Sequence, residues 1–278
     1  AALKIPVSYR VSAIVLGIAL MLLVAIKHMA ASSKIADIAK AAAVLAALEV
    51  ALGAVAAFDT YLLRVARFTL WQAALSTLLS VVPAILVARA LARHPSFPGR
   101  ALVLRLFALP LALPAIVVAL GVLALLGRAG FFADAITAAT GSHWQGIYGL
   151  SGILVAHVFF NLPLASRLFL GALETVPADQ WRLAAQLGMG AHASFRFIEW
   201  PVLRAALPGV AGLVFMLCVT SFTIVLTLGG GPSATTLEVA IYQALRFDFD
   251  PARAVALTAL QIVLVVATVA GLSRLGAD

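Results

Sequence analysis

Two groups of polar residues lie within otherwise apolar stretches of the chain and could do chemistry there. His157 and Asn161 are four residues apart, so a helix would place them on one face. Two such residues form an interhelical hydrogen bond, worth about 0.6–2 kcal/mol, more readily than a metal site, which needs more ligands. The second group is a run of hydroxyls beside an aromatic ring: Thr220, Ser221, Phe222 and Thr223. Hydroxyls in a helix commonly bond to their own backbone, and lining a polar path is the alternative.

The motifs of common catalytic sites are absent from the sequence. It has no Gly-x4-Gly-Lys-Ser/Thr phosphate loop, and Gly229-Gly230-Gly231 is not followed by Lys. No Ser-His-Asp arrangement or pair of catalytic carboxylates can be recognised from spacing. The single Cys218 excludes a disulfide framework and a thiolate metal site. We therefore expect no catalytic residue, no metal ion and no cofactor bound by the chain itself.

Composition determines where these residues must be placed. Hydrophobic residues make up 64% of the 278 residues, charged residues only 11%, and the mean hydropathy is +1.11. A soluble domain of this length would need more charge to cover its surface, so lipid must cover most of it. The net charge of +8 comes from Lys and Arg at the ends of apolar runs, which favours lipid headgroups over nucleic acid as the partner.

Continuous apolar runs predict an all-α membrane protein, since crossing the hydrocarbon core takes roughly 20 helical residues. The runs lack the alternation of strands. We divide the chain into residues 1–60, a first membrane helix at 11–26 plus an Ala-rich connection, and a core of residues 61–278. In that core we expect spans near 62–91, 106–127, 147–168, 203–228 and 253–274.

Two features complicate the count of six spans. Residues 41–58 are Ala-rich with Glu49 at their centre, and they remain open between an interfacial helix and a seventh span. Prolines inside the runs, namely Pro83, Pro110, Pro114 and Pro163, predict kinks. With six spans, the excess of Lys and Arg on the side of the termini places both termini in the cytoplasm.

The connection at residues 172–201 is the most informative part of the chain. Pro177 suits the first turn of a helix, which we expect over residues 178–187 and ending at Gly188. Ala184, Ala185 and Gly188 would give this helix a small-residue surface that another protein's backbone could approach closely. A solvated surface loop is the alternative interpretation.

This connection resembles the signature loop of ABC importer permeases, Glu-Ala-Ala-x3-Gly-x9-Ile-x-Leu-Pro. Four residues match in register: Ala184, Gly188, Ile198 and Pro201. Arg182 stands at the Glu position, Leu183 at the first Ala and Trp200 at the Leu. The resemblance implies the type I importer permease fold and a coupling helix that docks on a cytoplasmic ATPase.

Longer stretches are similar to the permease family of thiamine or thiamine pyrophosphate importers, in its amino-terminal six-span half. They include RFTLWQAALSTLLSVVPAILVARAL, GILVAHVFFNLPLASRLFLGALE and LGGGPSATTLEVAIYQALRFDFDPARA, and the match covers about residues 60–275. The resemblance implies a multi-pass protein of the bacterial inner membrane, with ATP hydrolysed by a partner ATPase dimer. It further implies an extracytoplasmic substrate-binding protein and a second six-span half from the same or another chain.

Within this resemblance, two sets of residues become candidates for contacting cargo or partners. The first is the hydroxyl run at Thr220, Ser221, Phe222 and Thr223, which would line the pathway of a cationic cargo. The second is an outer gate or binding-protein contact after the break at residues 229–232, and it comprises Gly230, Pro232 and Glu238. A helix resting at the membrane interface is the alternative for the second set. We also expect Asp248 and Asp250 to cap the last span.

Other cargoes and another mechanism remain open. Permeases for iron, polyamines, sulfate or molybdate share the loop signature. An ion-coupled secondary transporter would need buried acidic or His coupling residues and an internal repeat, and the sequence shows neither beyond His157. A membrane enzyme would need clustered His or Asp at the membrane boundary, which the sequence does not show.

Overall fold

The computed structural model describes residues 60–231 and 234–275, and every regular element in these ranges is a helix. The predicted all-α class is confirmed for this part of the chain. The first predicted span at 11–26, the Ala-rich stretch at 41–58 and Pro232 lie outside the described residues. The described residues form two compact units, a smaller one of residues 60–67 and Leu237–Val263 and a larger one of residues 68–231, 234–236 and 264–275.

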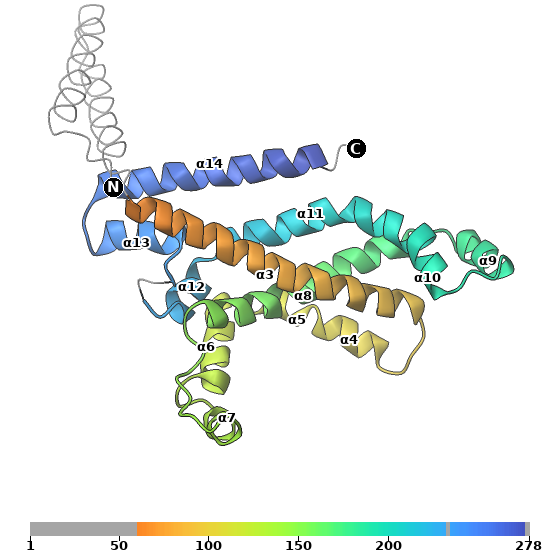
Figure 1. Cartoon of the computed structure of the whole chain (residues 1–278), viewed down its shortest axis with the longest axis horizontal. Coiled ribbons are helices and arrows are strands. Elements are labelled where there is room, and N and C mark those ends of the chain that lie inside the picture. Colours follow the sequence, from red (N-terminus) through yellow and green to blue (C-terminus); the bar gives the residue numbers. More distant parts are fainter. Residues whose placement is uncertain (1–59, 232–233, 276–278) are drawn as a thin grey trace, which may run out of the picture. The chain divides into compact units, whose positions relative to one another are not determined.

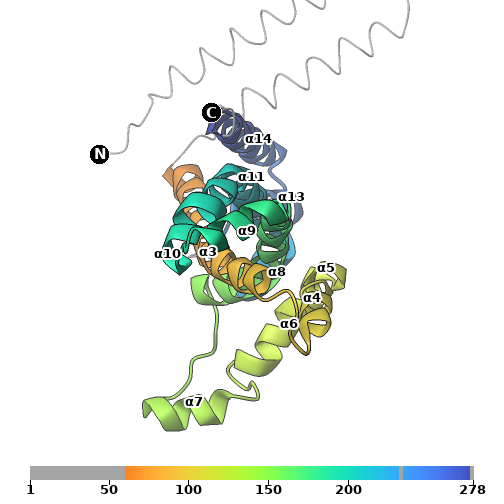
Figure 2. The same cartoon turned by 90° about the vertical axis from the view of Figure 1, so that its right-hand side faces the viewer.

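The larger unit is built on three long helices: α3 (Thr60–Arg93) from residue 68 onward, α8 (Leu150–Glu174) and α11 (Trp200–Val219). Figure 2 shows them as a bundle. Seven residues along one face of α3 are small or polar and fully buried: Thr69, Gln72, Ala73, Ser76, Ser80, Ala84 and Ala88. Small side chains let helices approach closely in a membrane, where no hydrophobic effect drives them together. Phe169, Leu203 and Val214 fill the core against this face.

The opposite face of α3 is apolar and exposed, as expected of a helix surrounded by lipid. Trp71, Leu78, Val82 and Leu86 are each at least half exposed. Among the described residues, four helices are long and apolar enough to cross a membrane, and a bent pair of helical segments makes up to five. One of the four lies in α14 (Pro251–Leu275), whose first turn is capped by Asp250: its Oδ1 accepts a hydrogen bond from the Arg253 amide at 3.0 Å. Capping by Asp250 was predicted and is confirmed.

The predicted span at 106–127 is broken in the structure, beside Pro114, where the sequence predicts a kink. The chain there forms α4 (Arg100–Leu106), α5 (Leu109–Ala112) and α6 (Ala115–Leu126), with a bend of 108° between the α4–α5 segment and α6. Pro114 explains the break, because proline lacks an amide donor and disfavours helical geometry in the residue before it. Leu113 is accordingly extended, with φ −84° and ψ 133°.

The predicted span at 203–228 is also interrupted. Helix α11 ends at Val219, and α12 (Phe222–Leu228) begins after an extended Ser221 with ψ 93°. Neither Pro nor Gly stands at this break. Hydroxyl side chains compete with the backbone for hydrogen bonds, which weakens a helix at a Thr-Ser pair. The Thr220 hydroxyl does this, donating to the Met216 carbonyl at 2.9 Å.

Shorter elements occupy the two ends of the larger unit. At one end lie α9 (Ala178–Gln186) and α10 (Ala191–Ser194), and at the other α6, α7 (Ala133–Thr140) and α12 (Figure 1). One π-helical turn, η1 (Phe195–Glu199), joins α10 to α11. In the smaller unit, α13 (Leu237–Arg246) precedes the part of α14 that ends at Val263.

Candidate functional site

The short helix predicted in the 172–201 connection is present as α9. Pro177 precedes its first residue, and Gly188 ends it with φ 65°, in the left-handed region. The Met189 amide donates to the Ala184 carbonyl at 2.9 Å, and the Gly188 amide to the Ala185 carbonyl at 3.1 Å. This pair of bonds is the Schellman motif, which favours glycine because a left-handed backbone costs other residues about 1–2 kcal/mol. The sequence therefore determines where α9 stops.

The exposed apolar residues of α9 and of the turn that ends it form a surface, which we call the α9 face. It consists of Leu183, Ala185, Leu187 and Gly188, with Leu183 56% and Leu187 69% exposed. A Cβ atom added at Gly188 would meet nothing within 4 Å. Ala184, which we expected on this surface, is buried instead. The α9 face thus leaves open space around its glycine, and two leucines stand beside it.

The other residues of the predicted coupling loop have separate environments. Arg182 forms an ion pair with Asp179 at 3.0 Å, and both side chains are at least 75% exposed, so the pair contributes little to stability. Ile198 is buried, Trp200 is 38% exposed, and Pro201 lies exposed in the first turn of α11. The loop therefore combines residues that anchor it with residues that face outward.

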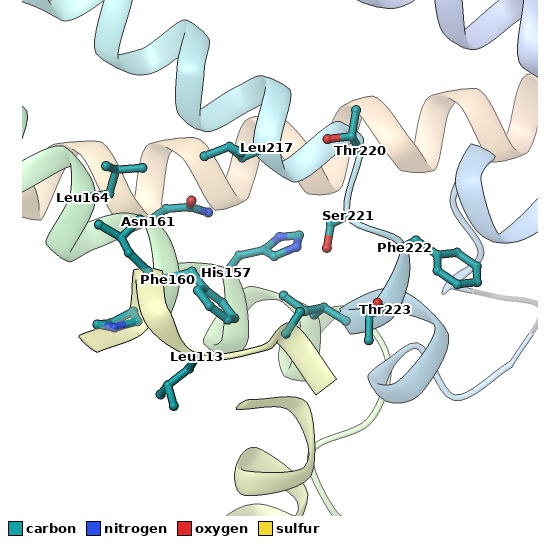
Figure 3. Close-up of a pocket in the computed structure, with 14 residues that line it drawn as sticks. Leu113, His157, Phe160, Asn161, Leu164, Leu217, Thr220, Ser221, Phe222 and Thr223 are labelled. Carbon is teal, nitrogen blue, oxygen red and sulfur yellow. The ribbon is translucent and has the colours of Figure 1, made fainter. Parts of the chain in front are cut away.

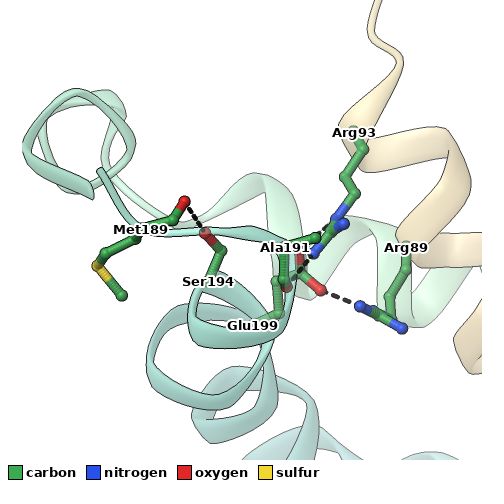
Figure 4. Close-up of polar contacts among 6 residues, drawn as sticks. All are labelled: Arg89, Arg93, Met189, Ala191, Ser194 and Glu199. Atoms are coloured by element: carbon green, nitrogen blue, oxygen red, sulfur yellow. Dashed lines mark hydrogen bonds and ion pairs between the residues drawn. The ribbon is translucent and has the colours of Figure 1, made fainter. Parts of the chain in front are cut away.

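A buried carboxylate joins this loop to α3. Oε2 of Glu199 lies 2.6 Å from Nε of Arg89, and Oε1 lies 2.7 Å from Nε of Arg93, while the Glu199 side chain is 2% exposed (Figure 4). Arg93 also donates through Nη2 to the Ala191 carbonyl at 3.1 Å, and the Arg89 guanidinium stacks 3.9 Å from the centre of the Phe195 ring. We call Glu199, Arg89 and Arg93 the arginine clamp.

The arginine clamp was missed from the sequence, because Glu199 occupies the unspecified position between Ile and Leu in the loop signature. A signal was available. A carboxylate flanked by the apolar Ile198 and Trp200 requires a cationic partner when it is buried. Arg89 and Arg93 are four residues apart and therefore share one face of α3, ready to hold the two oxygens of one carboxylate.

A cavity of about 420 Å³ lies where α8, the α4–α6 break and the α11–α12 break meet. It brings together the two polar groups that the sequence singles out, His157 with Asn161 and the hydroxyl run. Figure 3 shows the His157 imidazole and the Ser221 hydroxyl directed into the same space. None of the 14 lining residues is Asp, Glu, Lys or Arg. Its polar lining residues are His157, Asn161, Thr220, Ser221 and Thr223.

The hydroxyls at the cavity differ in what they already bind. The Thr220 hydroxyl is taken up by the Met216 carbonyl of its own helix. The hydroxyls of Ser221 and Thr223 make no hydrogen bond to any described residue. Phe222 lines the same cavity. Of the four residues predicted here, Ser221 and Thr223 are thus the ones with a hydroxyl available to a ligand.

Buried polar side chains connect the three long helices beside the cavity. Ser76 Oγ of α3 lies 2.9 Å from Nδ1 of His157 on α8, and Asn161 Nδ2 donates to Sγ of Cys218 on α11 at 3.3 Å. Gln72 Nε2 donates to the Cys218 carbonyl at 3.0 Å. The interhelical hydrogen bonds predicted for His157 and Asn161 are confirmed. Nε2 of His157 is also buried, yet it has no partner among the described residues.

The residues predicted at an outer gate fall in two places. Gly230 lies in the turn after α12 with φ 70°, and a Cβ there would come within 3.2 Å of Tyr148 Cβ. Glu238 of α13 accepts a hydrogen bond from Nε2 of Gln261, inside the smaller unit. Pro232 lies outside the described residues. Among residues 60–231 and 234–275, no three His, Cys, Asp or Glu side chains gather as a metal site.

Comparison with protein families gives a match over residues 80–275 to the inner membrane component of binding-protein-dependent transport systems. The chain belongs to this family. It is accordingly a multi-pass protein of the inner membrane, in agreement with its apolar helices. Members of this family are components of transport systems.

Curated relatives show which kind of transport permease the chain resembles in sequence. The chain is 67% identical over 212 residues to the thiamine transport system permease protein ThiP of Brucella abortus (strain 2308), covering 76% of this chain and 39% of that protein. It is 58% identical over 206 residues to ThiP of Escherichia coli (strain K12), covering 74% and 38%. The chain thus spans about two fifths of the length of these relatives.

The fold is shared with a bacterial ABC transporter involved in the import of the acidic polysaccharide alginate. The TM-score is 0.60 at 14% identity, covering 78% of this chain and 80% of that one. At this identity the likeness concerns the fold alone. The predicted importer permease fold is therefore confirmed for this inner membrane component, independently of its cargo.

Proposed function

We propose that the chain is permease machinery of an ATP-driven importer that carries thiamine into the cytoplasm. The observation that carries this proposal is the 67% identity, over 212 residues, to a thiamine transport system permease protein. The thiamine cation fits a lining without Lys or Arg, which would repel it. The proposal concerns the whole transporter, of which this chain supplies a part.

Energy would come from a partner: a cytoplasmic ATPase dimer would hydrolyse the ATP, and this chain would not itself be an enzyme. The α9 face supports docking of such an ATPase because Leu183 and Leu187 are exposed beside the open space around Gly188. Movement of α9 would reach α3 through the arginine clamp and α11 through η1. Both helices border the buried polar residues beside the cavity.

The cavity would form part of the cargo pathway. Thr220, Ser221, Phe222 and Thr223 line it, and Ser221 and Thr223 offer hydroxyls without internal partners. A pathway must release its cargo, so neutral polar groups suit a permanent cation better than a buried carboxylate that would hold it. Affinity would then come from a separate extracytoplasmic substrate-binding protein, and Gly230, Pro232 and Glu238 would face its side. A second six-span half would complete the pathway.

Uptake measurements test the proposal. Cells without thiamine uptake of their own would express the permease with its ATPase and binding protein, and receive labelled thiamine, iron, spermidine, sulfate or molybdate. We expect thiamine alone to accumulate, and only with an ATPase whose phosphate-loop Lys is intact. Accumulation of another solute without thiamine would overturn the cargo, and uptake driven by an ion gradient with an inactive ATPase would overturn the energy source.

A further inference from the structure

One polar atom beside the cavity has no partner. His157 is 2% exposed, and its Nδ1 is satisfied by Ser76 Oγ at 2.9 Å. Its Nε2 is buried and meets no hydrogen-bonding group among the described residues. A buried polar atom without a partner destabilises a folded protein, and such atoms are rare. The interhelical bond to Ser76 needs only one ring nitrogen, so it does not explain the second one.

The surroundings of this atom form a site for a small molecule. His157 lines the cavity of about 420 Å³, a size within the range of small-molecule sites. Ser221 directs its free hydroxyl into the same space, Thr223 also lines it, and Phe160 contributes an aromatic ring (Figure 3). Flat apolar surface combined with a few fixed polar groups is what binds and orients an aromatic ligand.

Charge restricts which ligand fits. The lining of this cavity contains no Lys or Arg that would pair with a phosphate, and no Asp or Glu. Leu217 and Thr220, at the C-terminal end of the 20-residue helix α11, form part of the lining. Such helix ends carry a partial negative charge that favours cations. A cationic or neutral ring is therefore accommodated, whereas a phosphorylated one leaves its phosphate unpaired in this chain's part of the site.

We propose that Nε2 of His157 hydrogen-bonds a nitrogen heterocycle of the unphosphorylated cargo as it passes through this cavity. Ser76 holds the imidazole by Nδ1 and so directs Nε2 at the ligand. For thiamine, the aminopyrimidine ring supplies the matching nitrogen groups. The inference rests on the proposed function, and it adds a cargo-contacting residue that selects the ring.

Two isosteric variants of His157 distinguish the roles of its two ring nitrogens. In His157→Gln the amide group takes the position of Nε2, and the hydrogen bond to Ser76 is lost. In His157→Asn the amide group takes the position of Nδ1, so Ser76 keeps a partner and the cargo loses one. We expect His157→Gln to keep thiamine uptake within about threefold of wild type. His157→Asn should lower it about tenfold, which corresponds to ~1.4 kcal/mol. The opposite order would show that His157 serves only the interhelical bond.

A selectivity readout and a third variant complete the test. Uptake of thiamine is compared with uptake of its analogue that carries a carbonyl oxygen in place of the ring amino group. The ratio of the two should fall most in His157→Asn and less in Ser76→Ala, which keeps Nε2 but removes the hydroxyl that orients the ring. An unchanged ratio in all variants overturns the inference. Absence of thiamine uptake by the wild type overturns the proposed function instead, so the two failures are distinguishable.

Discussion

The Glu199 carboxylate lies 2.6 Å from Nε of Arg89, although the two residues are 110 positions apart in the sequence. Glu199 ends the π-helical turn η1, and Arg89 stands in the last turns of α3. π-helical turns within helices are often found at functional sites. This ion pair, together with Arg93, fixes the end of the α9–η1 connection to the first helix of the bundle.

Loss of the Glu199 charge should destabilise the protein. Glu199→Gln leaves Arg89 and Arg93 without their anion, and hydrogen bonds to charged groups contribute about 1.5–3 kcal/mol each. Because the two arginines are partly exposed, we expect a loss near the lower end, measured as the free energy of unfolding in detergent. Asp179→Asn is the matched control, since the exposed pair with Arg182 should contribute less than about 1 kcal/mol. An equal loss of unfolding free energy in both variants would show that the arginine clamp stabilises the protein no more than an exposed ion pair does.

The same variant should uncouple ATP hydrolysis from transport. If the arginine clamp carries movement of α9 to α3, Glu199→Gln should keep most of the ATPase activity of the assembled transporter and lose at least about half of its thiamine uptake. The ratio of cargo moved to ATP hydrolysed, measured in proteoliposomes, reports this directly. A parallel fall of both rates, with the ratio unchanged, would contradict a role of the clamp in coupling.

Much of this fold follows from local sequence signals. The ends of α9 are predictable because Pro177 and Gly188 act on the backbone next to them. The membrane helices follow from apolar runs of sufficient length. Each of these signals depends only on residues that are close in the sequence, so these elements can be predicted without knowing what packs against them.

The breaks and the clamp depend on more than local pattern. Pro114 was expected to kink a span, and whether a proline kinks or breaks a helix depends on what packs around it. Nothing in the Thr220-Ser221 pair alone requires a helix end, since hydroxyls are common within spans. The pairing of Glu199 with two arginines of α3 joins residues more than 100 positions apart, which spacing alone does not reveal.

Two substitutions of Gly188 distinguish its role in ending α9 from its role in docking. Alanine tolerates its left-handed conformation poorly, whereas asparagine adopts it more readily but projects a larger side chain from the α9 face. We expect Gly188→Ala to lower the thermal stability of the permease more than Gly188→Asn. For co-purification with the ATPase we expect the reverse, because the added side chain meets open space in this chain and only a partner can collide with it. If both measurements ranked the variants alike, the α9 face would not be the docking surface.

The hydroxyls at the cavity should contribute to uptake according to whether they have a partner, and Thr220 is the matched control. Ser221→Ala together with Thr223→Val removes the two hydroxyls that have no partner, so we expect thiamine uptake to fall about three- to tenfold at equal amounts of protein in the membrane. Thr220→Val removes a hydroxyl that already bonds to the Met216 carbonyl, and uptake should stay within about twofold of wild type. Initial rates of labelled thiamine uptake would distinguish them. Unchanged uptake in the double variant, or an equal loss in Thr220→Val, would mean that the hydroxyls support the α11–α12 break and do not contact cargo.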